Sequence, residues 1–489
     1  MQTQRSPYFF VITLIIGLCS VGNAQVIEGD VTLSTQAEVY SFSGTSITGN
    51  LTIYGSDIVD LTPLSTLESI DGSLWVFGNP ALTNLVGLAS LAAIGDGLSI
   101  EVNNSLTHLD GLGNLTTVGD YLTLQDNPLL TDLDGLSNLT TVGDLLKVSS
   151  NALLTNLDGF SNLTTVGGSL KLIYNPLLRD LDSLSNLSTV GGDLWVEENA
   201  SLTNLDGLSN LTSVGDDLDI YDNDSLTNLD GLSNLTAVGG RLYVTANSSL
   251  INLDGLNNLN AVIGDLIVGS NVSLTTLAGL SNLTTVGDRL YLHHNPALID
   301  LDGLDNLTTV GSDLWIDSNP VLTNLDGLSG LSSVGFNLTV DSNFSLGRFC
   351  GLSPLLSSGG LAHGYVVTGN LLNPTQQQII DDGPCTTTEI QGAELMPKRY
   401  SLHQNYPNPF NPITSIRFDL PEASVVRLTV FDISGREVVT LVQSEKPPGK
   451  YQIQWNGLDQ SGNPVNTGVY LCCLSVGDFK KTIKMLYIK

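Results

Sequence analysis

The sequence predicts an all-β protein: a parallel β-solenoid of 24-residue leucine-rich coils, followed by a small antiparallel immunoglobulin-like β-sandwich. Leu recurs every 24 residues from Leu74 to Leu338, and Asn follows five residues after each, from Asn79 to Asn343. A unit with seven apolar positions cannot bury them alone, so neighbouring units must stack. After residue 400, alternating apolar runs are separated by turn residues, as in antiparallel strands.

Within each unit, Leu-x-Val or Leu-x-Ile predicts a short strand whose first and third residues face the core, as in Leu194-Trp195-Val196. The stretch Leu-x-x-Leu-x-Gly-Leu-x-Asn-Leu lacks the spacing of a sustained helix and predicts extended segments with tight turns. The Asn column predicts an internal amide ladder that closes each coil.

The ends of a solenoid must be covered, because an exposed sheet edge can pair with other strands. Val26–Ile47 is expected to form a β-rich N-terminal cap, and Phe349–Cys385 a C-terminal cap with a strand at Tyr365–Val367. A short helix should follow, capped by Asn373 with Pro374 at its first position. Export would favour a disulfide between Cys350 and Cys385.

Residues 1–24 have the features of a secretory signal peptide: Arg5, an apolar core and a small-residue cleavage site. We expect no transmembrane span in the mature chain. The predicted domains are the solenoid with its caps at 25–388, a linker at 389–399 and a second unit at 400–489. Residues 25–393 carry 41 acids and 6 bases, a net charge of −35, which argues against nucleic-acid binding.

The repeat pattern of residues 45–350 resembles the receptor L domains, leucine-rich β-solenoids that bind ligands in growth-factor receptors. It departs from the usual leucine-rich pattern L-x-x-L-x-L-x-x-N. The family's functions vary too widely to assign one from this resemblance.

Five strands are expected in the second unit: Thr414–Leu420, Val425–Asp432, Lys450–Trp455, Val469–Ser475 and Lys481–Ile488. The motifs YSLHQNYPNPFNP (400–412), FDISG (431–435), WNGLD (455–459), GVY (468–470) and KKTIKMLYIK (480–489) resemble a type A sorting domain of the type IX secretion system. That resemblance implies export through the type IX machinery. The recognition elements would be Gly468, Val469, Tyr470, Lys480, Lys481, Lys484 and Lys489. The alternative is an adhesive immunoglobulin-like module without a sorting role.

Two repeated polar columns have both a structural and a functional interpretation. Asn-Leu-Thr sequons occur at Asn114, Asn138, Asn162, Asn210, Asn234, Asn282 and Asn306; we favour local turn chemistry over glycosylation. An Asp column occupies 110, 134, 158, 182, 206, 230, 254, 302 and 326. Bound calcium would offset its repulsion, but the Gly-Gly-x-Gly-x-Asp motif of calcium-binding rolls is missing. We therefore expect no cofactor and no metal, and Asp-Gly turns whose carboxylates accept backbone N–H bonds.

The outward positions of the Leu-x-Val strands vary from coil to coil, which makes them the candidate ligand-binding face. They are Trp75, Phe77, Trp195, Glu197, Asp219, Tyr221, Tyr243, Tyr291, His293, Trp315 and Asp317. Aromatics beside acids on a flat sheet suit stacking on sugar rings or anchoring a protein. Alternatively, aromatics merely fit strands.

Catalysis has little support in the sequence. The chain has five histidines, and the adjacent pair His293-His294 should place its side chains on different faces or in a turn. No nucleophile motif or phosphate-binding loop occurs. The sequence favours a secreted, surface-displayed, non-enzymatic binding protein for a polysaccharide or protein ligand. The alternative is a structural or adhesive spacer.

Overall fold

The computed structural model describes residues 25–385, 399–446 and 449–488. The expected signal peptide, residues 389–398 of the expected linker and Lys489 lie outside the described residues. The chain divides into two compact units, Met1–Cys385 and Thr386–Lys489. No helix in the described part is long and apolar enough to cross a membrane.

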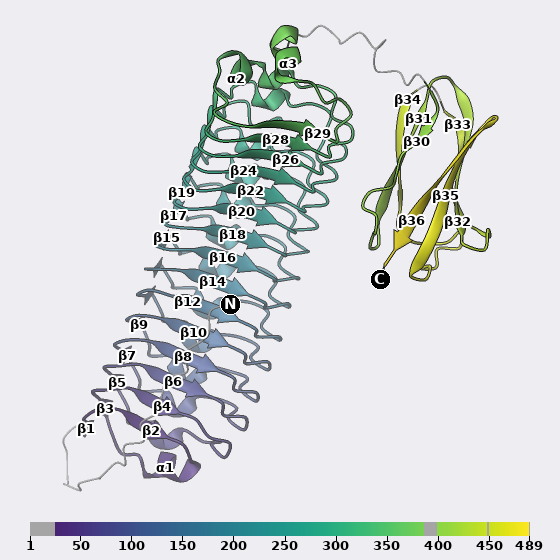
Figure 1. Ribbon diagram of the computed structural model, residues 1–489. Helices are drawn as coiled ribbons and strands as arrows, with labels where there is room; N and C mark the ends of the chain where they lie inside the picture. The colour runs from purple at the N-terminus through teal and green to yellow at the C-terminus, as the bar shows by residue number, and fades with distance from the viewer. Residues whose placement is uncertain (1–24, 386–398, 447–448, 489) are drawn as a thin grey trace. The chain divides into compact units, whose positions relative to one another are not determined.

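The first unit is a parallel β-solenoid, as predicted (Figure 1). Each coil gives one strand to a 14-stranded sheet, sheet A, and one to a 15-stranded sheet, sheet B. The repeat length keeps equivalent residues in register, so Leu218 pairs with Leu194 on one side and with Leu242 on the other.

Sheet A consists of β1 (Val26–Ile27), β3 (Ser46–Ile47), β5 (Ser69–Ile70), β7 (Ala93–Ile94), β9 (Thr117–Val118), β11 (Thr141–Val142), β13 (Thr165–Val166), β15 (Thr189–Val190), β17 (Ser213–Val214), β19 (Ala237–Val238), β21 (Ala261–Val262), β23 (Thr285–Val286), β25 (Thr309–Val310) and β27 (Ser333–Val334). Sheet B consists of β2 (Val31–Leu33), β4 (Leu51–Ile53), β6 (Leu74–Phe77), β8 (Leu98–Glu101), β10 (Leu122–Gln125), β12 (Leu146–Ser149), β14 (Leu170–Ile173), β16 (Leu194–Glu197), β18 (Leu218–Tyr221), β20 (Leu242–Thr245), β22 (Leu266–Gly269), β24 (Leu290–His293), β26 (Leu314–Asp317), β28 (Leu338–Asp341) and β29 (Tyr365–Thr368).

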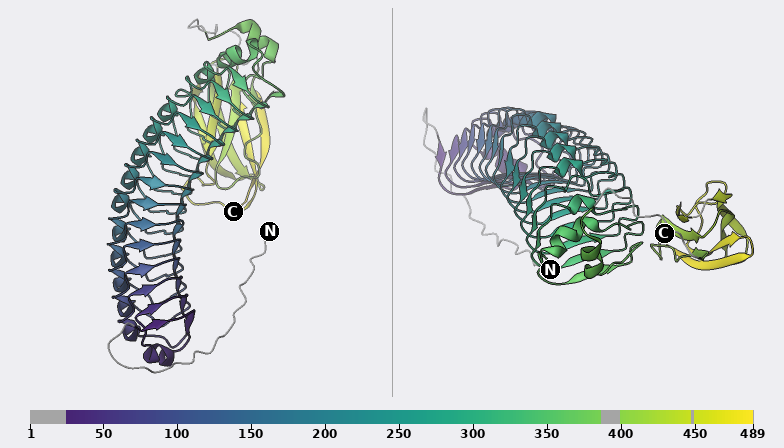
Figure 2. Two further views of the ribbon diagram at one scale, coloured as in Figure 1. Left: turned by 90° about the vertical axis from the view of Figure 1, so that its left-hand side faces the viewer. Right: turned by 90° about the horizontal axis from the view of Figure 1, so that it is seen from above.

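Most coils contain a single 3₁₀ turn between their sheet B strand and the next sheet A strand, which the sequence interpretation described only as a tight turn. These turns form a row along one side of the solenoid (Figure 2). They are η1 (Thr62–Leu64), η2 (Val86–Leu88), η3 (Asp110–Leu112), η4 (Asp134–Leu136), η5 (Asp158–Phe160), η6 (Asp182–Leu184), η7 (Asp206–Leu208), η8 (Asp230–Leu232), η9 (Asp254–Leu256), η10 (Ala278–Leu280), η11 (Asp326–Leu328) and η12 (Cys350–Leu352). Adjacent turns pack so closely that a Cβ on Gly231 would lie 1.8 Å from the carbonyl oxygen of Leu205. The repeated Gly is therefore required by the stacking of the coils.

The core is one continuous apolar column with the Asn ladder beside it. The repeated Leu and Val side chains are buried, and the ladder residues from Asn79 to Asn343 are fully buried. Asn223 Nδ2 donates to the carbonyl oxygens of Val196 (2.8 Å) and Tyr221 (3.1 Å), and to Asn247 Oδ1 in the next coil (3.3 Å). The predicted amide ladder is confirmed, and it satisfies backbone groups that would otherwise be buried without partners.

Each cap contains one helix that was not expected, and the short helix expected after the strand at Tyr365–Val367 is present. The N-terminal cap, expected to be β-rich, includes α1 (Gln36–Ser41), which starts at a capping box formed by Thr35 and Glu38. In the C-terminal cap, α2 (Ser353–Ser357) precedes β29, and α3 (Gln376–Asp382) follows it.

The N-cap of α3 is Thr375 rather than Asn373, because Thr375 and Gln378 form a reciprocal capping box. Asn373 instead ends the amide ladder. Its Oδ1 accepts from the backbone nitrogen of Asn370 at 3.0 Å and from the Asn370 side chain at 3.2 Å.

The second unit contains two antiparallel sheets, ordered β30-β31-β34 and β33-β32-β35-β36. Its strands are β30 (Ser401–Leu402), β31 (Thr414–Leu420), β32 (Ser424–Asp432), β33 (Glu437–Lys446), β34 (Gly449–Trp455), β35 (Gly468–Val476) and β36 (Phe479–Tyr487). The sequence interpretation missed β30 and β33. Irregularities in the β32–β33 pairing, between Leu428 and Thr429 and between Val430 and Phe431, interrupt the alternation by which such a strand is recognised.

Candidate functional site

The outer face of sheet B is the candidate site. We use this name for three outward columns: the residue before the buried Leu of each strand, the residue after that Leu, and the last residue of the strand. Parallel register places equivalent residues of successive coils side by side, for example Tyr291 beside Trp315 and His293 beside Asp317. Only the second and third columns were predicted from the sequence to face outward.

At the N-terminal end of the outer face, Trp75 and Phe77 both have aromatic partners. Trp75 Nε1 donates to the Tyr121 hydroxyl at 2.6 Å, and Phe77 stacks on Tyr54 with ring centroids 5.4 Å apart. Tyr121 lies over Gly97, where a Cβ would come within 2.2 Å of its ring. The indole N–H of Trp75 is thus engaged within the protein.

In the middle of the outer face, a lysine covers Trp195. Lys171 Nζ lies 3.3 Å from the indole centroid and 3.3 Å from Asp193 Oδ2. The nitrogen of the Trp195 indole is buried and has no hydrogen-bond partner. One face of the ring is therefore occupied by a cation, and a sugar could not stack there without displacing it.

Asp219, expected to be exposed, is buried, with 3% of its surface accessible. Arg241 Nε and Nη2 donate to its two carboxylate oxygens, at 3.2 Å and 2.5 Å. Burial raises the pKa of Asp219, while the Arg241 charge acts in the opposite direction. Arg241 was not among the predicted site residues, because it lies in the first column, before the buried Leu242.

The remaining predicted residues around Arg241 are partly covered as well. The Arg241 guanidinium lies 5.1 Å from the Tyr243 ring centroid, and Tyr243 is 6.1 Å from Tyr221. Glu197 is half-buried, and burial, followed by the charge of Asp219, raises its pKa. This part of the face is a network of internal contacts.

In the C-terminal part of the outer face, the aromatic side chains contact one another. We call Tyr291, His293, Trp315 and Asp317 the aromatic patch. The Tyr291 ring stacks on His293 with centroids 4.2 Å apart and meets Trp315 edge to face at 5.3 Å. Trp315 is 40% exposed and is the only exposed one of the four tryptophans, all of which are among the described residues. Burial, together with the charge of Asp317 and a hydrogen bond to it, raises the pKa of Tyr291 to about 12.

The basic residues of the solenoid concentrate on the outer face. Residues 25–393 contain six Lys and Arg in all, and four of them, Lys147, Lys171, Arg241 and Arg289, lie in its columns. Three of the four are paired with acids; Arg289, for instance, makes a bidentate contact with Asp265 at 3.2 and 2.9 Å. Lys147 donates instead to Gln125 Oε1 at 2.7 Å. The basic side chains of this face are therefore all engaged in contacts within the solenoid.

The two polar columns have clear structural roles. Each sequon Asn donates from Nδ2 to a carbonyl oxygen of the preceding coil, as Asn210 does to Ser185 at 2.6 Å. The Asp column departs from expectation: in its 3₁₀ turns the carboxylate is not the N-terminal cap. The backbone nitrogen of Asp230 donates to the side chain of Asn228 at 3.0 Å, so the residue two positions earlier supplies the acceptor.

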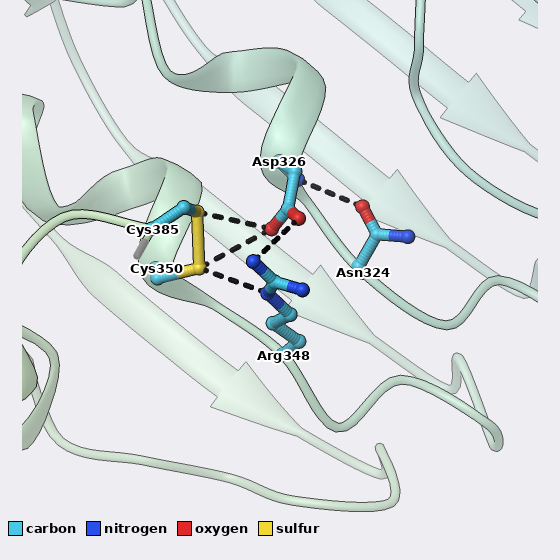
Figure 3. Close-up of a disulfide and its surroundings, with 5 residues drawn as sticks. All are labelled: Asn324, Asp326, Arg348, Cys350 and Cys385. Atoms are coloured by element: carbon cyan, nitrogen blue, oxygen red, sulfur yellow. Dashed lines mark hydrogen bonds and ion pairs between the residues drawn. A yellow bond between two sulfur atoms is a disulfide. The ribbon is translucent and has the colours of Figure 1, made fainter. Parts of the chain in front are cut away.

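Cys350 and Cys385 form a disulfide that ties the end of the C-terminal cap to η12 (Figure 3). Asp326 lies against both sulfurs and forms an ion pair with Arg348 at 3.1 Å. Within the described ranges, Asp326 and these cysteines are the only group of three metal-capable side chains with donor atoms within 4.8 Å. Because the sulfurs are bonded to each other, no thiolate is available there for a metal.

In the second unit, the expected sorting residues lie on two paired strands, β35 and β36. Gly468, Val469 and Tyr470 begin β35, and the Tyr470 hydroxyl donates to the Asn466 carbonyl at 2.6 Å. Lys480, Lys481 and Lys484 are exposed along β36. The proline-rich segment 405–412 is bound to β36. Asn408 Nδ2 donates to the Lys484 carbonyl at 3.1 Å, and Phe410 pairs with Tyr487.

Comparison with known proteins gives a match within the second unit. Residues 412–476 match the sequence model of the family described as the FlgD Ig-like domain. No curated protein matches the chain. The matched region contains β31 to β35, whereas residues 405–411 and β36 lie outside it.

Proposed function

We propose that the chain is a secreted, surface-displayed, non-enzymatic binding protein, exported by the type IX route through residues 400–489. The export proposal is supported by the signal-like N-terminus and by the C-terminal sorting motifs. The Ig-like match of residues 412–476 is consistent with it but says nothing of secretion.

We propose that the solenoid binds its ligand, a polysaccharide, at the aromatic patch. The observation that carries this proposal is the exposure of Trp315 beside the stacked pair Tyr291 and His293 on the outer face of sheet B. One exposed ring beside two partly exposed rings suits the apolar faces of sugar rings. Because the nearby Arg289 is held by Asp265, the patch offers no free cation to an anionic ligand, which favours a neutral glycan.

The spacer alternative is favoured by a different observation, the extent of internal pairing elsewhere on the outer face. Trp75, Trp195 and Asp219 all have partners within the solenoid. If these contacts serve only to stabilise the sheet, the variable columns carry no ligand specificity.

A matched pair of variants separates the two functions. The full mature chain is screened against a panel of neutral and acidic glycans as wild type, as Trp315→Ala and as Trp195→Ala. Glycan binding lost in Trp315→Ala and retained in Trp195→Ala supports the aromatic patch. No binding by the wild type supports the spacer. Equal binding by all three proteins rejects the aromatic patch as the binding site.

A further inference from the structure

We propose that His293 and His294 bind one divalent transition-metal ion of the class that prefers imidazole, such as Ni²⁺, Cu²⁺ or Zn²⁺. Their Nδ1 atoms lie 3.2 Å apart. Two imidazole nitrogens that bind one ion at about 2.0–2.1 Å, with a tetrahedral or right angle between them, are separated by about 2.8–3.4 Å. The pair thus has the spacing of two ligands on one ion.

The backbone explains how two adjacent histidines reach the same side. Strand alternation would send them to opposite faces, but His294 follows the end of β24 with φ at +53°. The equivalent residue has positive φ in each coil from Val102 to Ser342, so this turn belongs to the solenoid itself. In those coils, 293–294 is the only pair in which the last strand residue and the positive-φ residue after it are both histidine.

The ring of His293 is fixed by its neighbours. It stacks on Tyr291, with the ring planes 30° apart. It also lies over Gly269, where a Cβ would come within 2.1 Å of Nε2. The side chain is half-buried, and these contacts direct its Nδ1 towards His294, which is exposed. A donor held in this way loses little freedom when an ion binds.

The surroundings favour a cation. Asp317 pairs in register with His293, and the solenoid carries a large excess of acids. The described residues hold no third donor close enough to form a group with both imidazoles, so water would complete the coordination shell. The proposal does not depend on the proposed glycan site. Its competitor is a simple N–H···N hydrogen bond between two neutral rings.

The test is calorimetric titration of the full mature chain, without a polyhistidine tag, with Ni²⁺. We expect one ion per chain and a loss of affinity of about tenfold or more in both His293→Gln and His294→Gln. His108→Gln is the matched control, because His108 is an exposed single histidine paired with Asp132. Gly269→Ala should also weaken binding, since it displaces the His293 ring.

The experiment has clear contrary outcomes. Absence of a stoichiometric Ni²⁺ site in the wild type would leave only the hydrogen bond between the rings. Undiminished binding in both His→Gln variants, or displacement of Ni²⁺ by equimolar Ca²⁺, would place the ion in the acidic columns, because Ca²⁺ prefers oxygen ligands. Circular dichroism verifies that each variant retains its β-structure.

Discussion

The ammonium group of Lys171 lies 3.3 Å from the centre of the Trp195 indole ring, so that the side chain of one coil covers the aromatic ring of the next. The sequence places Trp195 and Trp315 in the same outward column. Their environments differ because the preceding strand carries Lys171 in one case and Tyr291 in the other.

Replacing Lys171 with Ala should uncover Trp195. We expect a red shift of tryptophan emission and a loss of about 1 kcal/mol in the free energy of unfolding, because a half-buried cation–π contact is removed. The control is Lys147→Ala, whose partner is Gln125 rather than an aromatic ring. Equal emission spectra of the two variants would contradict the covering role. If ring access limits glycan stacking, Lys171→Ala should also gain binding.

Removing one Asn side chain of the amide ladder should lower the free energy of unfolding far more than removing an exposed Asn side chain. Asn223→Ala leaves the buried carbonyl groups of Val196 and Tyr221 without their side-chain donor, so we expect a loss of about 3 kcal/mol or more. Asn210→Ala, at an exposed sequon, should cost about 1 kcal/mol. Chemical denaturation measures both. Similar losses would mean that the ladder is not the main polar support of the coils.

The stability of the second unit should depend on pH through Asp432. Hydrogen bonds from the Ser434 hydroxyl and from Arg436 lower the Asp432 pKa from 3.8 to about 2. Because the pKa of Asp432 is lower in the folded state than in the unfolded state, ionised Asp432 stabilises the fold at pH values above its unfolded pKa. This stabilisation is lost as the pH falls from about 4 to about 2. Asp432→Asn should abolish this component.

The readout for Asp432 is the fluorescence of buried Trp455, measured after the three solenoid tryptophans are replaced by Phe. Wild type and Asp432→Asn are compared in urea at pH 5 and pH 2. An equal loss of stability in the two proteins would exclude Asp432 as a source of the acid dependence.

The export proposal can be tested without unfolding the second unit. Deleting residues 468–489 would remove β35 and β36 and so disrupt the larger sheet. Replacing the exposed Lys480, Lys481 and Lys484 by Gln removes three positive charges from β36 without removing a strand. We expect this triple variant to accumulate in the periplasm, as measured by cell fractionation. The matched control replaces Arg427, an exposed basic residue elsewhere in the unit; normal display of the triple variant would reject these lysines as a signal.

Much of the fold could be predicted because the repeat period encodes it. Leu218 and Asn223 each contact the equivalent residue in a neighbouring coil, so a residue repeated at each coil specifies both the contact and its partner. The cap at Thr375 and strand β33 were missed for a different reason. The helix start at Thr375 depends on a local capping box with Gln378. Strand β33 pairs irregularly with β32 and therefore lacks the regular alternation of a strand.

The candidate site was only partly predictable. The outward columns could be identified from alternation alone, but whether a residue there is available depends on a side chain 22 or 24 positions away. Arg241 buries Asp219, and Lys171 covers Trp195.

The sequence by itself determined the coil, its register, its core and its amide ladder, because each of these arises from identical residues stacked at a fixed period. Only the tertiary structure decided which outward side chains are free. It also placed His293 and His294 side by side, because a left-handed turn after each sheet B strand overrides the alternation that a strand would impose.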